Sequence, residues 1–313
     1  MVFEVKAPPL GFATYFVNFT KQNRREGAFK SHKSIVHETS DLKDSEEDIV
    51  IKNEFVRLQF SKKTGRLVSM TDMISKLTTT VDQQFLWYAA SDGNGISSQA
   101  SGAYIFRPNS SEPYVVSPGN KAEIKIFVGP LVQEVRQVFS AFASQVVRLY
   151  SGQRHAEFEY TIGPIPVNDN RGKEIITRFD TDIKSESLFY TDANGREMQK
   201  RKRNYRPTWK LEVTEPVSGN YYPINSRVYI KDSKSQMTIL TDRSLGGSSL
   251  KDGSVEIMLH RRLLRDDQRG VGEALNEPGT TGKGLVVRGK LSVILAPPED
   301  SAALHRVLGE EML

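Results

Sequence analysis

The stretch from His260 to Gly270 holds the densest group of side chains that could bind or position a ligand. Its last ten positions carry four arginines and two aspartates. A guanidinium offers a rigid fork of donors and a carboxylate accepts two hydrogen bonds, so this combination suits sugar hydroxyls. A loop whose charges pair with one another would contain the same residue types. The composition of the stretch therefore leaves a sugar-binding role and a purely structural role open.

The adjacent pair Asp266 and Asp267 is the candidate for carboxylate chemistry. Glycoside hydrolysis needs two carboxyl groups roughly 5 to 9 Å apart across a sugar. Neighbouring residues of a strand point to opposite faces, so both could reach one cleft only from a loop. We therefore favour the interpretation that the two aspartates are solvated, or ion-paired with the nearby arginines.

Metal binding and nucleophilic catalysis find little support in the residue types. The histidines do not recur at the close spacing of a metal site, and the chain has no cysteine. There is no Gly-x-Ser-x-Gly elbow, no phosphate-binding loop and no dinucleotide fingerprint. We expect this chain to hold no metal and no other cofactor. The histidines are His32, His37, His155, His260 and His305.

The basic run from Arg196 to Arg206 has the residue types of a nucleic-acid contact, with Tyr205 and Trp209 offering rings for stacking. Glu197 interrupts the run, and the 43 Lys and Arg of the chain only modestly exceed its 38 Asp and Glu. We predict a solvated loop, or an edge strand whose charges prevent further pairing. A nucleic-acid partner is not expected.

Two N-glycosylation sequons occur, at Asn18 (Asn18-Phe19-Thr20) and at Asn109 (Asn109-Ser110-Ser111). They carry information only in a chain that enters the secretory pathway. The first residues do not read as a signal peptide, and no apolar run is long enough to predict a membrane span. The sequence therefore fits an intracellular protein or a part of a longer secretory product.

Hydrophobic alternation with a period of two runs through most of the chain and predicts strands. The clearest case is a hairpin from Val146 to Ile162 that turns at Ser151-Gly152-Gln153. Only residues 301–312 have a helical pattern. Many strands separated by frequent turns predict an all-β fold, a large antiparallel β-sandwich. Further strands are predicted at 55–60, 66–70, 122–128, 227–231, 237–241, 255–259 and 291–295.

The large β-sandwich domain is expected to comprise residues 49–313. Residues 1–20 include the segment from Thr14 to Val17, which predicts a strand too isolated to bury a face of its own. We interpret these residues as the end of a preceding small β domain. The polar and charged residues 21–48 would be a linker or a long exposed loop.

A set of motifs follows one another along the chain. They are Pro8-Pro9-Leu10-Gly11-Phe12, the segment from Gln99 to Asn109 that contains Ser101-Gly102-Ala103-Tyr104, Pro130 to Val135, Gly163 to Val167, Arg178 to Thr181, Tyr190 to Glu197, Tyr205 to Lys210, Gly219 to Pro223, Thr241 to Leu250 and Arg261 to Gly270. In this order they resemble the C-terminal β-sandwich portion of class II α-mannosidases, glycoside hydrolase family 38, of the lysosomal type. The resemblance covers nearly the whole chain.

The resemblance implies a retaining glycosidase that trims α-linked mannose from N-glycans in the lysosome or the secretory pathway. In this family the aspartate nucleophile, the aspartate acid/base and the zinc ligands belong to an N-terminal catalytic domain, which this sequence does not contain. The chain alone is then expected to be inactive, with N-glycan or oligomannose as substrate and the N-terminal domain as partner. The implied fold is a galactose-mutarotase-like supersandwich with a short preceding β segment.

The resemblance also implies which residues of this chain reach the sugar. Tyr104 would form a hydrogen-bonding wall of the mannose pocket, and an arginine of the second motif would join it. Arg269 is favoured over Arg262, although the sequence does not separate them. Asp266 and Asp267 would hold the arginines in place. The alternative for Tyr104 is a strand tyrosine in the core of the sandwich.

Two functions of other classes remain open at this point. A free-standing carbohydrate-binding or scaffold β-sandwich would bind mannose without any upstream domain. A nucleic-acid binder would rest on the run from Lys200 to Arg203 and would bind oligonucleotides with steep salt dependence.

Overall fold

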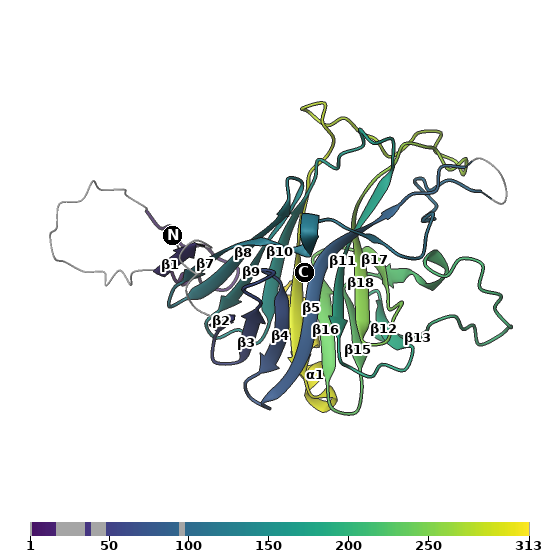
Figure 1. Cartoon of the computed structure of the whole chain (residues 1–313). Helices are drawn as coiled ribbons and strands as arrows, with labels where there is room; N and C mark the ends of the chain where they lie inside the picture. Colours follow the sequence, from purple (N-terminus) through teal and green to yellow (C-terminus); the bar gives the residue numbers. More distant parts are fainter. Residues whose placement is uncertain (1, 17–34, 39–47, 94–97, 313) are drawn as a thin grey trace, which may run out of the picture.

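The computed structural model describes residues 2–16, 35–38, 48–93 and 98–312. Two large antiparallel sheets make up the molecule, and the strands that form them are joined by turns and loops (Figure 1). The sandwich predicted from the alternation is thereby confirmed. One sheet has ten strands in the order β1-β7-β8-β9-β10-β19-β16-β15-β12-β13. The other has nine, in the order β14-β17-β18-β11-β5-β4-β3-β2 with β6 paired to β5.

The strands of the ten-stranded sheet are β1 (Ile35–Glu38), β7 (Glu123–Val128), β8 (Val132–Ser140), β9 (Ala143–Tyr150), β10 (Ala156–Ile162), β12 (Leu188–Ala193), β13 (Glu197–Lys202), β15 (Arg227–Lys231), β16 (Gln236–Thr241) and β19 (Val287–Ala296). Those of the nine-stranded sheet are β2 (Ile49–Lys52), β3 (Val56–Phe60), β4 (Leu67–Asp72), β5 (Leu77–Ala89), β6 (Tyr114–Val115), β11 (Lys173–Thr181), β14 (Tyr222–Ile224), β17 (Leu245–Ser248) and β18 (Ser254–Arg262). Two 3₁₀ turns, η1 (Pro118–Asn120) and η2 (Ser218–Asn220), and one helix, α1 (Pro298–Glu311), complete the described elements.

The main core lies between the two sheets, where every second side chain of a strand points inward. In β10 the residues Ala156, Phe158, Tyr160 and Ile162 are buried and those between them are half-buried. Phe158 meets Phe179 of the opposite sheet edge to face, with ring centres 5.5 Å apart. Such contacts between the two inner faces hold the layers together.

Three sequence-based expectations differ from the structure. Residues 14–16 form no strand, since no neighbouring strand supplies hydrogen bonds for them, and Val17 lies outside the described residues. Within the segment expected to be a linker, β1 pairs with β7 at the edge of the ten-stranded sheet. The helix begins at Pro298, because a proline fits the first turn, where no intrahelical N–H partner is needed. At 14 residues, α1 is too short to cross a membrane, and no other described segment is a helix that could.

The outer face of the nine-stranded sheet carries a buried polar network. Arg178 of β11 donates through Nη2 to Glu256 Oε2 of β18 at 2.6 Å. The hydroxyls of Tyr88 and Tyr221 donate to Glu256 Oε1 at 3.0 and 2.6 Å. A smaller apolar cluster that includes Leu86, Ile176 and Val217 surrounds the network. The segment from 203 to 221 and the loop around Phe106 cover this face, so the sandwich has a third layer here.

Helix α1 is attached to the ten-stranded sheet through a buried histidine. Arg227 of β15 donates from Nη1 to His305 Nδ1 at 3.1 Å and to the His305 carbonyl at 2.9 Å. Arg227 and His305 are 4% and 5% exposed. Burial, and then the charges of Arg227 and Arg306, lower the pKa of His305 to about 4.

This pKa predicts a pH dependence of stability. Because the folded state holds His305 neutral down to about pH 4, whereas the unfolded chain protonates it near 6.5, the free energy of unfolding falls as pH drops through that window. We expect a loss of about 2 kcal/mol, reduced by solvent screening at the helix edge. His305→Asn keeps an acceptor for Arg227 but does not titrate. The free energy of unfolding, measured with urea at several pH values, should change less with pH in this variant than in the wild type. Equal pH dependence of the two proteins would contradict the assignment.

Candidate functional site

The ends of several strands bring distant loops together at one end of the sandwich. Lys173 at the start of β11 is paired with Ala89 at the end of β5 and with Arg262 at the end of β18. In the ten-stranded sheet, Ile162 at the end of β10 is paired with Val287 at the start of β19. The loops that contain Tyr104 and the stretch 263–286 therefore emerge from the same end.

Tyr104 lies at the tip of a tight loop rather than in a strand. The loop is closed by Gly102, whose N–H donates to the Ile105 carbonyl at 2.9 Å. At its base the Ser101 hydroxyl accepts from Arg107 N at 2.6 Å and donates to Arg107 O at 3.0 Å. The Tyr104 side chain is 61% exposed, so the alternative of a core tyrosine is wrong.

Asp267 holds the tip of this loop. Its Oδ2 accepts from the backbone N–H groups of Tyr104 and Ile105 at 2.7 and 2.9 Å, and its Oδ1 accepts from Arg269 N at 3.2 Å. A Cβ at Gly102 would lie 2.5 Å from Asp267 Cγ, so only glycine allows this approach. The expectation that Asp267 is solvated or ion-paired is wrong, because the residue is fully buried and its partners are amides.

Arg261 is a second fixing point, and the sequence analysis missed it. Its Nη2 donates to the Ile105 carbonyl and to Glu174 Oε1, both at 2.8 Å. Glu174 on β11 is fully buried, and this burial raises the pKa of its carboxyl group while Arg261 opposes the rise. The two residues are paired in neighbouring strands but lie 87 positions apart, so no local pattern could have joined them.

The structure gives Arg262 and Arg269 different surroundings, which the sequence did not distinguish. Arg262 donates to the carbonyls of Ile165 and Lys283, each at 2.7 Å, and to Asn276 Oδ1 at 2.7 Å. It therefore fastens three loop segments to one another. Arg269 is exposed, and among the described residues its guanidinium donates to the carbonyl of the preceding residue, at 3.2 Å.

Tyr104 and the Arg269 segment lie side by side. A Cβ at Gly270 would be 3.3 Å from the Tyr104 hydroxyl and ring. Asp266 is half-buried, and its Oδ1 is a buried atom with no hydrogen bond in the described chain. Asp267 accepts from the Arg269 N–H, and that the two aspartates hold the arginines in place stays a prediction.

Within the described ranges, no three His, Asp or Glu side chains are grouped so that they could hold a metal ion. The residues present thus do not fit a zinc site. His32 and the side chain of His37 lie outside the residues that can be described.

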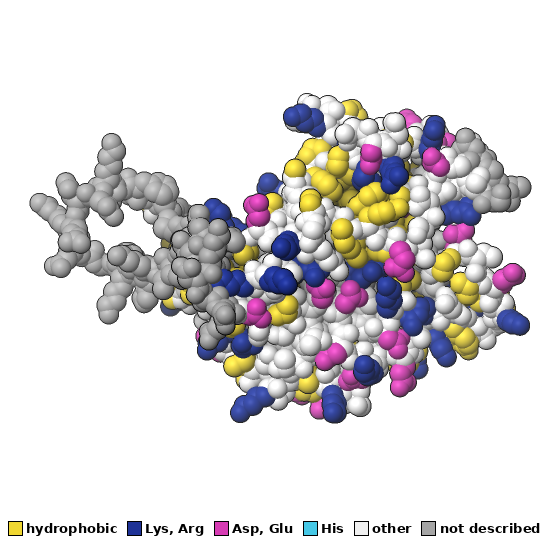
Figure 2. All heavy atoms as spheres, in the orientation of Figure 1, with side chains coloured by type: hydrophobic (Ala, Val, Ile, Leu, Met, Phe, Trp, Pro, Cys, Tyr) yellow, Lys and Arg dark blue, Asp and Glu magenta, His cyan; other side chains and the backbone are white. Residues whose placement is uncertain are grey.

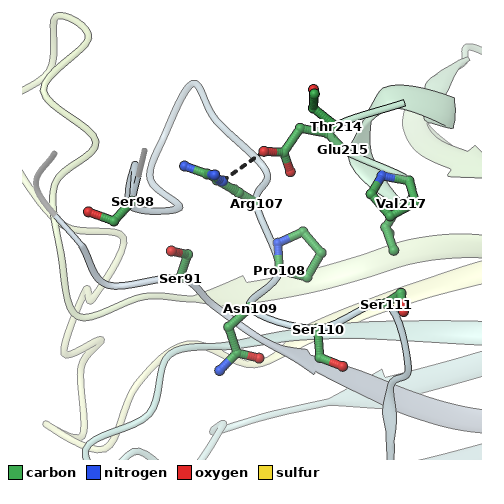
Figure 3. Close-up of a pocket in the computed structure, with 11 residues that line it drawn as sticks. Ser91, Ser98, Arg107, Pro108, Asn109, Ser110, Ser111, Thr214, Glu215 and Val217 are labelled. Carbon is green, nitrogen blue, oxygen red and sulfur yellow. Dashed lines mark ion pairs between the residues drawn. The ribbon is translucent and has the colours of Figure 1, made fainter. Parts of the chain in front are cut away.

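Beside the Tyr104 loop lies a hollow of about 410 Å³ (Figure 3). One wall comes from the segment around Ser91 and Arg107, and the other from Thr214 to Val217. Arg107 Nε and Glu215 Oε1 form an ion pair of 2.9 Å between the walls. The sequon residue Asn109 is exposed and lines the hollow. The other sequon, at Asn18, lies outside the described residues.

The basic run forms β13 at the edge of the ten-stranded sheet, as the edge-strand interpretation predicted. Its cations have partners: Arg201 lies 4.3 Å over the Tyr222 ring and Lys202 lies 5.2 Å from the Tyr205 ring. Beyond the strand, Arg203 pairs with Asp252 at 3.0 Å. Trp209 is 58% exposed on the loop that follows. The absence of a nucleic-acid partner stays a prediction.

Apolar side chains gather on the upper part of the face shown in Figure 2, above a region of mixed charge. Trp87 near the end of β5 stacks on Tyr114 of β6, with ring centres 4.6 Å apart. Large exposed apolar residues at this end of the sandwich are Tyr104, Tyr114, Val115, Leu285 and Val286. Exposed apolar groups of this kind mark binding surfaces for a partner or a ligand.

The fold is that of a two-sheet antiparallel β-sandwich domain. Residues 51–269, more than half of the chain, match the family model described as glycosyl hydrolases family 38 C-terminal domain. The chain belongs to this family. The matched region includes Tyr104, Asp267 and Arg269.

The chain is also similar to curated relatives and to solved structures. The chain is 52% identical over 310 residues to a lysosomal alpha-mannosidase of Bos taurus, covering 99% of this chain and 29% of that protein. It thus spans about 30% of the length of the curated relatives it matches. A family 38 glycosyl hydrolase from Enterococcus faecalis shares the fold over 92% of this chain and 34% of its own, with a TM-score of 0.63 at 16% identity. A galactose mutarotase-like protein from Lactobacillus casei overlaps 80% of this chain and 100% of its own, at 12% identity and a TM-score of 0.42.

Proposed function

We propose that this chain is the C-terminal portion of a retaining α-mannosidase that hydrolyses α-linked mannose from N-glycans. The observation that carries the proposal is the Tyr104 loop. The exposed Tyr104 is held at its N–H by the buried Asp267, and Arg261 holds the carbonyl of the next residue, Ile105. The exposed Arg269 follows in the neighbouring segment. A fixed phenol and a guanidinium at a loop end match the hydroxyls of a sugar.

In this proposal Tyr104 and Arg269 form one wall of the mannose pocket, and Asp267 positions both. Arg262 has the different task of fastening the loops behind them. Asp266 is half-buried with a buried Oδ1, so we assign it no contact with the sugar. The sugar contacts would be made by Tyr104 and Arg269, because both residues are exposed.

The nucleophile, the acid/base carboxyl group and the zinc are assigned to an N-terminal catalytic domain. The support is that the described residues do not fit a metal site and that the curated relatives are about three times as long. The exposed apolar side chains around Tyr114 and Leu285 would be the surface that this catalytic domain covers. Lysosomal or secretory location follows from the lysosomal relatives.

The 313-residue chain alone should therefore show no turnover of an aryl α-mannoside above the buffer rate. The expected reason is that one wall of a pocket binds weakly and supplies no nucleophile. Release of the aryl alcohol should be measured on purified chain, with the Tyr104→Phe variant purified in parallel as the control for contaminants. Activity that co-elutes with the chain and is lower in the variant would overturn the proposal that the active site is divided between this chain and an N-terminal domain.

A further inference from the structure

The hollow beside the Tyr104 loop has two walls that are separately fixed. Arg107 is held at its backbone by Ser101 and by Ser91, whose N–H donates to the Arg107 carbonyl at 2.9 Å. On the other side, the Pro216 carbonyl accepts from the buried Asn220 amide at 2.8 Å, and the Glu215 carbonyl accepts from Gly219 N at 2.9 Å. A hollow with fixed walls loses little entropy when a ligand enters.

The charges of this hollow cancel. Arg107 and Glu215 pair at 2.9 Å, and their side chains are 23% and 38% exposed, so donors and acceptors still face solvent. The other polar side chains are neutral: the amide of Asn109 and the hydroxyls of Ser91, Ser98, Ser110, Ser111 and Thr214. A phosphate or a metal cation would meet no excess charge here. A neutral ligand with many hydroxyls would meet donors and acceptors of both kinds.

The rest of the lining is apolar and compact. Figure 3 shows Pro108 between the serines on one side and Val217 on the other. Val217 is buried beneath the hollow and belongs to the apolar cluster on the outer face of the sheet. Rigid aliphatic surfaces of this kind suit the C–H face of a pyranose ring. A volume of about 410 Å³ lies within the range of ligand pockets.

From these observations we propose that the hollow between Arg107 and Glu215 is a carbohydrate subsite, separate from the wall formed by Tyr104 and Arg269. Two sources could supply the sugar. One is an oligosaccharide substrate that extends from the mannose pocket, and this arm rests on the proposed function. The other is the chain's own N-glycan on Asn109, which begins at the rim of the hollow and needs no mannosidase activity.

The first arm of the test uses chain made without glycosylation and a mannotriose with α linkages as the probe. Two-dimensional NMR should show shifts of the amides of Asn109, Ser110 and Val217 that saturate at millimolar probe. Glu215→Gln removes the charge but keeps the shape, and we expect at least about fivefold weaker binding, or about 1 kcal/mol. Tyr104→Phe should leave these shifts unchanged, which separates failure of the subsite from failure of the mannose pocket.

The second arm uses chain from a secretory host. Intact mass should show a glycan that is absent from Ser111→Ala, a variant that keeps Asn109 and removes the sequon. If this glycan fills the hollow, the amides of Ser110 and Val217 should exchange with deuterium about tenfold more slowly in the glycosylated chain than in Ser111→Ala. Protection in this arm, or saturable shifts in the first, supports the subsite. Absence of both overturns it.

Discussion

Replacing Glu256 by alanine is expected to lower the free energy of unfolding by about 3 to 5 kcal/mol. The carboxylate is 1% exposed and accepts from Arg178, Tyr88 and Tyr221, so its loss leaves a buried guanidinium and two buried hydroxyls without their acceptor. Burial, and then the charge of Glu256, raises the pKa of both tyrosines, which therefore remain neutral donors over the physiological range. Urea unfolding followed by tryptophan fluorescence measures the change.

Asp252→Ala is the matched control for this prediction. Its carboxylate pairs with Arg203 at 3.0 Å but is 51% exposed, and solvent screening limits the expected loss to below about 1 kcal/mol. A double variant, Glu256→Met with Arg178→Met, should be more stable than Glu256→Ala because no buried charge is left unpaired. If Glu256→Ala costs no more than the control, the network does not stabilise the outer face of the sheet.

Replacing Asp267 by alanine is expected to release the Tyr104 loop. Three hydrogen bonds to one carboxylate are lost, two of them to the N–H groups of Tyr104 and Ile105. Bonds to a charged group contribute roughly 1.5 to 3 kcal/mol each, but water can solvate the released amides. We expect a loss of about 2 to 4 kcal/mol in stability. The amide hydrogens of Tyr104 and Ile105 should exchange faster, and the free energy of opening derived from their exchange should fall by a similar amount.

The same variant tests the link between loop and catalysis. In the longer mannosidase, kcat/KM should fall on the order of a hundredfold, because a loosened Tyr104 no longer positions the sugar. Asp267→Asn retains one acceptor oxygen, so its kcat/KM should lie between those of Asp267→Ala and the wild type. Asp266→Ala, which removes an adjacent aspartate with no bond to the loop, is the control. Equal effects of Asp266→Ala and Asp267→Ala would contradict the positioning role.

The strands that alternation predicted are those with one inner and one half-exposed face. β3 and β10 are of this kind, and their predicted and observed bounds agree closely. β11 was not predicted, because its first seven residues are all buried and period-two patterning disappears where both faces are covered. The third layer over β5, β11 and β18 causes this burial. It is built from loops, and the sequence of a loop does not predict which surface it packs against.

Which residues contact the sugar stays a prediction, although the structure brings two of the predicted segments together. The resemblance singled out Tyr104 and the arginine stretch, and the structure places Tyr104 against Gly270. The roles of Asp267 and Arg261 could not be predicted, because the loop backbone groups that they bind, at Tyr104 and Ile105, lie more than 150 positions away. A side chain that binds a distant backbone leaves no pattern in its own neighbourhood. The same applies to the buried glutamines Gln83 and Gln145, which bond to each other across the two sheets.

The central claim is that this chain supplies one wall of a mannose pocket, and Tyr104 tests it most directly. The measurement is kcat/KM for an aryl α-mannoside in the longer mannosidase that we propose contains this chain, with Tyr104→Phe compared with wild type. Tyr205→Phe, another exposed tyrosine on a different loop, is the control. Loss of a single hydroxyl that bonds to the sugar should lower kcat/KM about ten- to a hundredfold without changing the unfolding transition. A value within twofold of wild type and of the control would contradict the claim.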